Sequence, residues 1–149
     1  MSISFFIYVK NGEGYDFPNS IQGKTSYEII PNYGTMDYDI WMHNDLEIIN
    51  PNYDSRLDIN MTNRNAHFVL NELGMDVESD PLLIDVFEAG LKATLERFSG
   101  ELIPGLPGYI NKNIHSFGVE DGYANNQMGR MLSLVEAARE YGATHIGWG

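Results

Sequence analysis

The clearest pattern in the chain is a strand that runs directly into a helix within residues 57–74. Residues 57–61 have the apolar character of a strand, and the apolar residues after them recur at helical spacing, at Ala66, Val69, Leu70 and Leu73. An Asn/Thr cluster separates the two, and such short polar side chains accept hydrogen bonds from the free N–H groups of a first helical turn. Gly74 predicts the end of the helix, because glycine readily adopts the left-handed conformation found there.

Two further helices are indicated in the second half of the chain. Ser79, Asp80 and Pro81 have the order of an N-cap followed by proline at the first helical position, which predicts a helix from there to Gly100. The third helix is expected over residues 125–141, where methionine, leucine, valine and alanine form one apolar stripe.

Strand patterns complete the predicted fold. Residues 3–9 are apolar on both faces, which is typical of an interior strand covered on both sides. Residues 143–148 predict a terminal strand, and weaker strand patterns fall at residues 25–30, 46–49 and 109–114. We therefore predict one domain, residues 1–149, of class α+β or α/β, with a mixed sheet of about four to six strands covered by three helices.

Charge and composition narrow the classes of partner. The 149 residues include 21 acidic and 9 basic side chains, which gives a formal net charge of −12. Because no surplus of Lys or Arg exists to contact phosphates, no nucleic-acid partner is expected. The absence of cysteine excludes disulfides, thiolate metal sites and a cysteine nucleophile. No stretch predicts a signal peptide or a membrane span, so a cytoplasmic protein is expected.

The chain contains no complete catalytic signature. Gly23, Lys24 and Thr25 match only the end of a phosphate-binding loop, without its first glycine. The four histidines lack the spacing of a zinc site, and no serine lies in a GxSxG elbow. The sequence therefore predicts no catalytic residue, no metal ligand and no cofactor.

The strand-to-helix junction is the candidate binding site. Asn63, Arg64, Asn65 and His67 fall in the first turns of the predicted helix, where free N–H groups and the helix dipole attract an anion. We predict that these four residues bind a small anionic ligand, with Arg64 supplying the local positive charge. The alternative is that the asparagines only cap and turn the chain while Arg64 neutralises neighbouring acidic residues.

Two motifs carry a family resemblance. The first marks the start and end of the helix after the junction, at Asn63, Asn65, Ala66, Leu73 and Gly74. The second lies near the C-terminus, at Gly122, Tyr123, Met131, Leu132 and residues 142–148. Together they resemble a small family of uncharacterised bacterial and phage α/β proteins. The resemblance implies no established activity, and its phage members favour an anti-defence role such as capture of a nucleotide signal.

Three classes of function remain. The favoured class is a non-enzymatic binding module for a small anionic or nucleotide-like ligand, in keeping with the nine tyrosines and the asparagine-rich junction. The alternative is a protein-binding accessory factor or inhibitor whose acidic surface meets a basic protein, and the third is a hydrolase with dispersed catalytic residues. A homodimer is also predicted, because Phe68 is expected to point outward and, with several aromatic residues of the loops, to need a cover.

Overall fold

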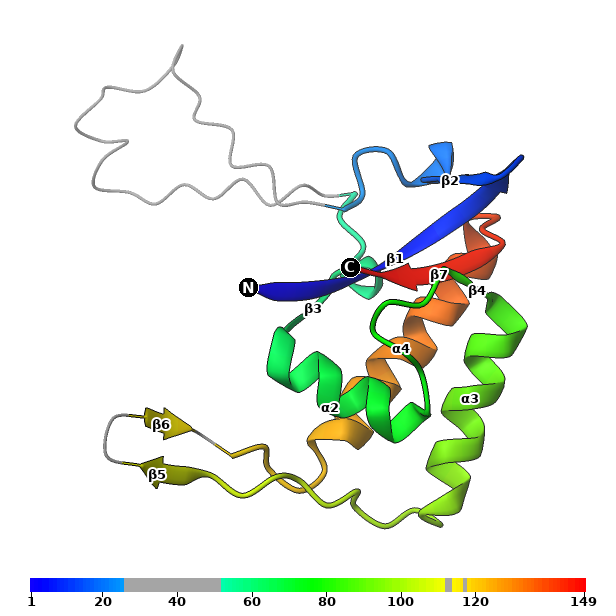
Figure 1. Cartoon of the computed structure of the whole chain (residues 1–149). Helices are drawn as coiled ribbons and strands as arrows, with labels where there is room; N and C mark the ends of the chain where they lie inside the picture. Colours follow the sequence, from blue (N-terminus) through cyan, green and yellow to red (C-terminus); the bar gives the residue numbers. More distant parts are fainter. Residues whose placement is uncertain (26–51, 112–113, 117) are drawn as a thin grey trace, which may run out of the picture.

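The computed structural model describes residues 1–25, 52–111, 114–116 and 118–149 (Figure 1). The strands among these residues are β1 (Ser2–Asn11), β2 (Gly14–Asp16), β3 (Ile59–Thr62), β4 (Leu82–Leu83), β5 (Tyr109–Asn111), β6 (Ile114–Ser116) and β7 (His145–Trp148). The α-helices are α2 (Asn63–Leu73), α3 (Ile84–Arg97) and α4 (Tyr123–Glu140), and two short 3-10 helices are η1 (Asn19–Ile21) and η2 (Ser55–Leu57).

β1 is the central strand of a five-stranded sheet in which every pairing is antiparallel. Along one edge of β1, residues 5–8 pair with β7. Along the other edge, residues 2–5 pair with β3 and residues 9–11 pair with β2. β4 extends the sheet beyond β7, and β5 and β6 form a separate hairpin.

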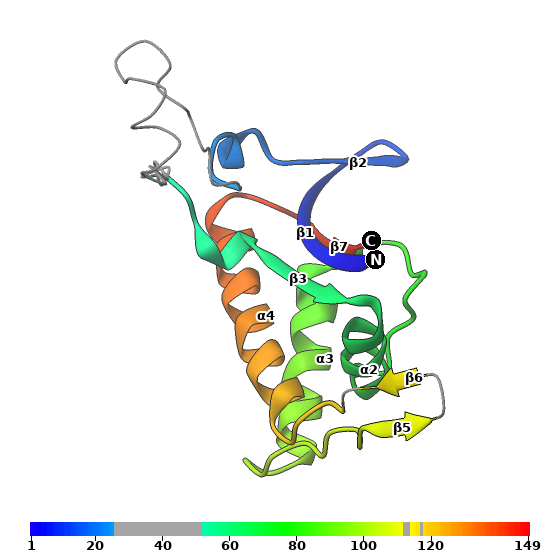
Figure 2. The same ribbon diagram turned by 90° about the vertical axis from the view of Figure 1, so that its left-hand side faces the viewer.

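The three helices all cover the same face of this sheet (Figure 1 and Figure 2). Ile3, Phe5 and Ile7 alternate along β1 toward this face and are buried. The helices add their own apolar stripes to the same core, among them Leu70 of α2, Phe87 of α3 and Met131 of α4. The predicted α+β domain, a sheet of four to six strands with three helices, is confirmed, and its sheet is antiparallel rather than mixed.

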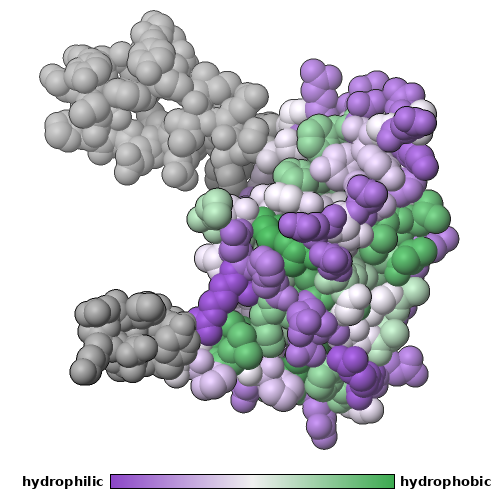
Figure 3. Space-filling model, viewed as in Figure 1, coloured by the Kyte–Doolittle hydropathy of each residue, from purple (hydrophilic) through white to green (hydrophobic). Residues whose placement is uncertain are grey.

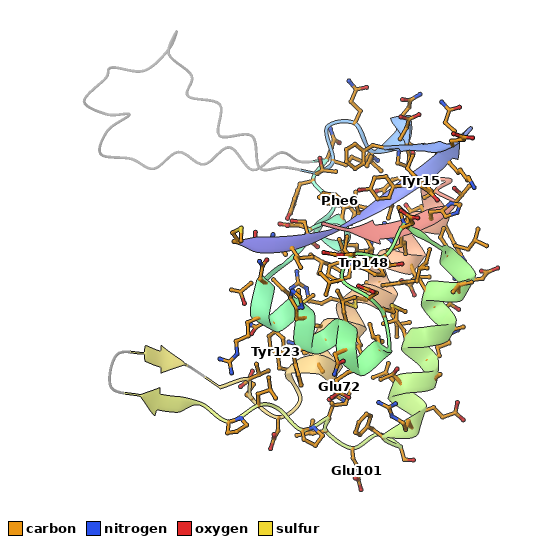
Figure 4. All side chains as sticks on the ribbon, in the orientation of Figure 1. Phe6, Tyr15, Glu72, Glu101, Tyr123 and Trp148 are labelled. Atoms are coloured by element: carbon orange, nitrogen blue, oxygen red, sulfur yellow. The ribbon has the colours of Figure 1, made fainter. Side chains whose placement is uncertain are left out.

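The opposite face of the sheet is covered by aromatic side chains and not by a described helix. Phe6 and Tyr8 of β1 point away from the helices and contact aromatic rings that come from β2 and from the chain just after it. Figure 4 shows Phe6 and Tyr15 on this outer side, whereas Trp148 lies toward the helices. The outer face is therefore covered by an aromatic cluster, which we define as Phe6, Tyr8, Tyr15, Phe17 and His145.

The start of the second helix was predicted wrongly. α3 begins at Ile84, with Leu83 as an N-cap that makes no side-chain hydrogen bond, and not at Pro81. Leu82 and Leu83 instead pair with β7, and the Ile84 N–H donates to the carbonyl of Thr144 at 3.2 Å. Tertiary strand pairing thus overrides the capping signal of the local sequence.

The remaining strand predictions have mixed outcomes. The pattern at residues 109–114 corresponds to the hairpin of β5 and β6. The predicted strand at residues 46–49, and all but the first residue of the one at 25–30, lie outside the described residues. The terminal strand and the helix at residues 125–141 are confirmed as β7 and α4, with bounds shifted by one or two residues.

Phe68 does not point to solvent, which corrects one basis for the predicted homodimer. Its side chain is partly buried and packs against the core. Apolar side chains that remain more than half exposed in the described part of the chain are scattered: Met1, Phe17, Leu83, Val86 and Leu102. Figure 3 likewise shows apolar side chains in separate patches among hydrophilic ones. Among the described helices, none is both long enough and apolar enough to cross a membrane.

Candidate functional site

The predicted junction residues lie together at the start of α2, and the cap is identified by its hydrogen bond. Thr62 is the N-cap, and its Oγ1 accepts a hydrogen bond from the backbone N–H of Asn65 at 3.4 Å. The backbone N–H of Asn63 donates to the carbonyl of Met1 at 3.3 Å. Gly74 ends the helix in the left-handed conformation, with φ 68°. The polar cluster thus caps the helix through Thr62.

The side chains of the junction point in different directions. Asn65 donates through Nδ2 to the hydroxyl of Tyr123 at 3.3 Å, which ties the first turn of α2 to the first turn of α4. Arg64 and His67 are exposed, and Asn63 is half-buried. None of these four residues lines either of the two best-formed hollows of the described structure. The prediction that they bind an anion stays a prediction.

A ligand-sized hollow lies elsewhere, beside the aromatic cluster. It has a volume of about 780 Å³, within the range of about 300–1,000 Å³ that is usual for small-molecule sites. Three segments line it: residues 4–7 of β1, residues 17–25, and residues 57–59 before and at the start of β3. Phe6 and Phe17 are a ring pair in this lining, with centroids 5.7 Å apart.

The edge of β1 has a gap at this hollow. Ser4 and Gly149 exchange both backbone hydrogen bonds at 3.0 Å, so the even-numbered residues of β1 bond to the β7 edge. Odd-numbered residues face the other edge, where Phe5 meets Ile59 of β3 and Val9 meets Asp16 of β2. Ile7 lies between them with no described residue paired to it on that edge. Its N–H and C=O therefore point to the hollow, which Ile7 lines.

The chemistry of this hollow is apolar and weakly acidic. Phe17 is 56% exposed and is available for contact, while Phe6 is half-buried against it. Amide side chains come from Asn19 and Gln22, and Asp58 is the one ionisable residue in the described lining. Asp58 already accepts a hydrogen bond from the Tyr53 hydroxyl at 2.6 Å. The lining therefore has rings, backbone and amide groups, but no described cation.

A polar clamp holds the chain near this hollow to the end of α4. Asp54 accepts hydrogen bonds from Arg56 Nη2 at 2.7 Å and from the Tyr141 hydroxyl at 2.6 Å. Arg56 also donates to Glu140 at 2.6 Å, and the ammonium of Lys24 lies 4.9 Å from the centre of the Tyr141 ring. The hydrogen bonds from the Arg56 side chain hold the pKa of Asp54 well below its usual range, with a further contribution from Tyr141.

The possible metal ligands of the described structure, its His, Asp and Glu side chains, do not cluster. In residues 1–25, 52–111, 114–116 and 118–149, no three His, Asp or Glu side chains gather as metal ligands. His145 is buried beside Tyr15, and its Nδ1 lies 2.7 Å from the Thr144 hydroxyl. Burial lowers the pKa of His145, and the charge of Lys10 lowers it further. The described contacts of His145 are thus packing against Tyr15 and a polar contact with Thr144.

The fold and this site together define the class of molecule as a single α+β domain with a ligand-sized hollow at the edge of its central strand. Comparisons with protein-family models, with curated proteins and with solved structures gave no match to the chain.

The sequence did contain a signal for the aromatic rings beside the hollow. Asn11, Gly12, Glu13 and Gly14 form a turn, and the strands that flank it, β1 and β2, are the two arms of a hairpin. Read as a hairpin, the alternation of Phe6 and Tyr8 places both rings on one face, and the return strand brings Tyr15 and Phe17 to the same face. The gap at Ile7 has no such signal, because it depends on where β2 and β3 end.

Proposed function

We propose that the protein is a non-enzymatic binding module whose main site is the hollow beside Ile7. The ligand class that fits is a small planar heteroaromatic compound, such as a nucleobase or nucleoside. The observation that carries this proposal is the gap at Ile7, where a backbone donor and acceptor meet a hollow lined by aromatic rings. A nucleobase offers the matching parts, because it has a hydrogen-bonding edge and a flat face.

The geometry favours a small molecule over a peptide strand at this edge. A partner strand would need several consecutive free positions, whereas β3 occupies β1 up to Phe5 and β2 occupies it from Val9. Among the described pairings only Ile7 remains without a partner on this edge, and one residue offers one donor and one acceptor. The edge of a single base is of this size.

The same lining residues favour ligand binding over catalysis. Catalysis of group transfer or hydrolysis needs a nucleophile or a general acid and base within hydrogen-bond reach of one another. Asp58 is the one ionisable group among the described lining residues, and it is bonded to a tyrosine hydroxyl. A role in sequestering a nucleotide-like signal, as the resemblance to phage proteins suggests, is consistent with such a site and remains a prediction.

Calorimetry with free nucleosides tests this proposal. The full chain is titrated with adenosine, guanosine, cytidine and uridine, and at least one is expected to bind saturably. Phe17→Ala should weaken that binding about 5- to 150-fold, because stacking of a base on an aromatic ring contributes about 1–3 kcal/mol. Leu102→Ala is the matched control, since Leu102 is 64% exposed and does not line the hollow.

Two results would contradict the proposal. One is that none of the four nucleosides binds, and the other is that Phe17→Ala binds as well as the parent. The junction hypothesis makes the opposite assignment: Arg64→Ala should then weaken binding by about 1.5–3 kcal/mol, the usual range for a charge-assisted hydrogen bond. With the ligand in the hollow, Arg64→Ala should leave nucleoside binding unchanged.

A further inference from the structure

A second, smaller hollow is lined by residues of η2, β3 and α4. Its volume is about 220 Å³, and its described lining is Ser55, Arg56, Ile59, Arg130 and Ser133. Two arginines and two serines thus line one small space. This is an unusual concentration of donors in a chain with a net charge of −12.

Arg130 carries the positive charge of this hollow. Its Nη2 donates to the backbone carbonyl of Asp58 at 2.7 Å, and its Nη1 donates to the side-chain oxygen of Gln127 at 3.3 Å. Both acceptors are neutral, and Arg130 forms no ion pair with any described residue. A guanidinium has five N–H donors in a fixed plane, so donors remain after these two bonds. The bonds also fix its orientation.

Arg56 contributes position more than charge. Its guanidinium is held by Asp54 at 2.7 Å and by Glu140 at 2.6 Å, so two carboxylates neutralise it. Asp54 and Glu140 are therefore engaged with Arg56, and Asp58 is engaged with the Tyr53 hydroxyl.

The two serines supply hydroxyl donors. Ser133 makes only a long hydrogen bond, 3.4 Å, to the carbonyl of Gly129. The hydroxyl of Ser55 bonds to no described residue, and Ser55 is exposed at the start of η2. The Ser55 proton is unused and that of Ser133 is held only by a long bond, and hydroxyls beside a fixed guanidinium are groups that bind phosphate and sulfate oxygens in proteins.

We propose that this hollow is an oxyanion site, which binds inorganic phosphate or the phosphate group of a small monoester. Arg130 makes the charged contact, and Ser55 and Ser133 donate to the remaining oxygens. The site stands independently of the main hollow, because no residue of the aromatic cluster lines it and its ligand needs no ring. It also gives the acidic chain an anion site away from the α2 junction.

Thermal unfolding and calorimetry of the full chain test the proposal. Inorganic phosphate should raise the melting temperature more than sodium chloride does at equal ionic strength, and the rise should saturate. Arg130→Gln should weaken phosphate binding at least about tenfold, the loss of one charge-assisted hydrogen bond. Arg97→Gln is the matched control: its guanidinium is also exposed, but it pairs with Glu72 at 3.5 Å on another surface, and binding should be unchanged.

A second variant is needed because Arg130 also donates to the Asp58 carbonyl, so Arg130→Gln can weaken binding by destabilising the fold. Ser133→Ala should keep the parent's melting temperature in chloride and weaken phosphate binding about tenfold or more, the loss of one hydrogen bond to a charged acceptor. Comparison of inorganic phosphate with glycerol phosphate separates a free anion from a monoester as the better ligand. The proposal is wrong if phosphate acts no differently from chloride, or if both variants bind it as the parent does.

Discussion

At the scale of single residues, hydrogen-bond geometry decides which member of a polar cluster acts. Asn60, Thr62, Asn63 and Asn65 all have side chains that suit an N-cap, so the sequence predicts the cap region without selecting the residue. The structure selects Thr62, because its backbone lies just before the first helical residue and its hydroxyl reaches the N–H of Asn65. The amide of Asn65 instead joins Tyr123, a partner 58 positions along the chain that local sequence does not indicate.

The cap assignment gives a direct prediction. Thr62→Ala should lower the free energy of unfolding by about 1 kcal/mol, the usual cost of losing an N-cap side chain. Asn63→Ala should cost less, because the contact that Asn63 makes with Met1 uses its backbone N–H. Urea denaturation of both variants measures the difference. A larger loss in Asn63→Ala than in Thr62→Ala would show that Thr62 is not the cap.

At the scale of elements, periodicity predicted the helices well and their starts less well. The apolar stripes of α2 and α4 identify these helices because a buried face repeats with the helical period. The start of α3 was missed because Pro81, which resembles a first-turn proline, packs on the outer face of β7 instead. That contact joins residues far apart in the chain, so no local pattern reveals it.

Two glycines test this packing with opposite expected signs. A Cβ on Gly147 of β7 would lie 2.9 Å from both Pro81 Cγ and Tyr8 Cε2, so Gly147→Ala should destabilise the protein by about 1–3 kcal/mol. Gly129 of α4 has no atom within 4 Å of an added Cβ, so Gly129→Ala should stabilise it by about 0.5–1 kcal/mol. Thermal unfolding reports both. Equal effects of the two substitutions would contradict the close packing over Gly147.

At the scale of the whole molecule, the polar clamp joins segments that are distant in the chain. Asp54 links the segment before β3 to the end of α4 through Tyr141, and the Ser20 hydroxyl donates to the Tyr141 carbonyl at 2.7 Å. The Asp54 N–H donates to the carbonyl of Lys24 at 3.0 Å, which brings together the two described ends that flank residues 26–51. The clamp therefore holds together two segments that line or adjoin the main hollow, residues 17–25 and residues 54–59.

The lowered pKa of Asp54 predicts an acid-sensitive clamp. Its carboxyl ionises at a lower pH in the folded chain than in the unfolded chain, where the pKa is about 3.9. The clamp therefore stabilises the fold above about pH 4, and this contribution is lost as the pH falls below that value. Unfolding free energies measured from pH 6 to pH 2 should fall less steeply in Asp54→Asn than in the parent. Glu136→Gln, an exposed position on α4, should keep the parent's slope.

Self-association is a separate prediction at this scale. The predicted homodimer no longer has Phe68 as its basis, since that ring packs against the core. Exposed apolar groups that it could use include Leu83 and Val86, close together in sequence where β4 meets α3. A dimer is expected to show twice the monomer mass of 16.8 kDa in light scattering at tens of micromolar, and a monomer mass there would contradict it.

The central claim is that the gap at Ile7 is a binding edge, and the amide resonance of Ile7 tests it most directly. In a two-dimensional NMR spectrum of the ¹⁵N-labelled chain, saturating nucleoside should shift the Ile7 amide downfield, because its N–H gains an acceptor. Amides on the β7 edge, such as that of Gly149, already have a partner and should move little. If the ligand binds at this edge, the Ile7 amide shifts saturably, and the shift is lost in Phe17→Ala. Binding that moves the amides of residues 63–67 and leaves Ile7 unchanged would contradict it and place the ligand at the junction.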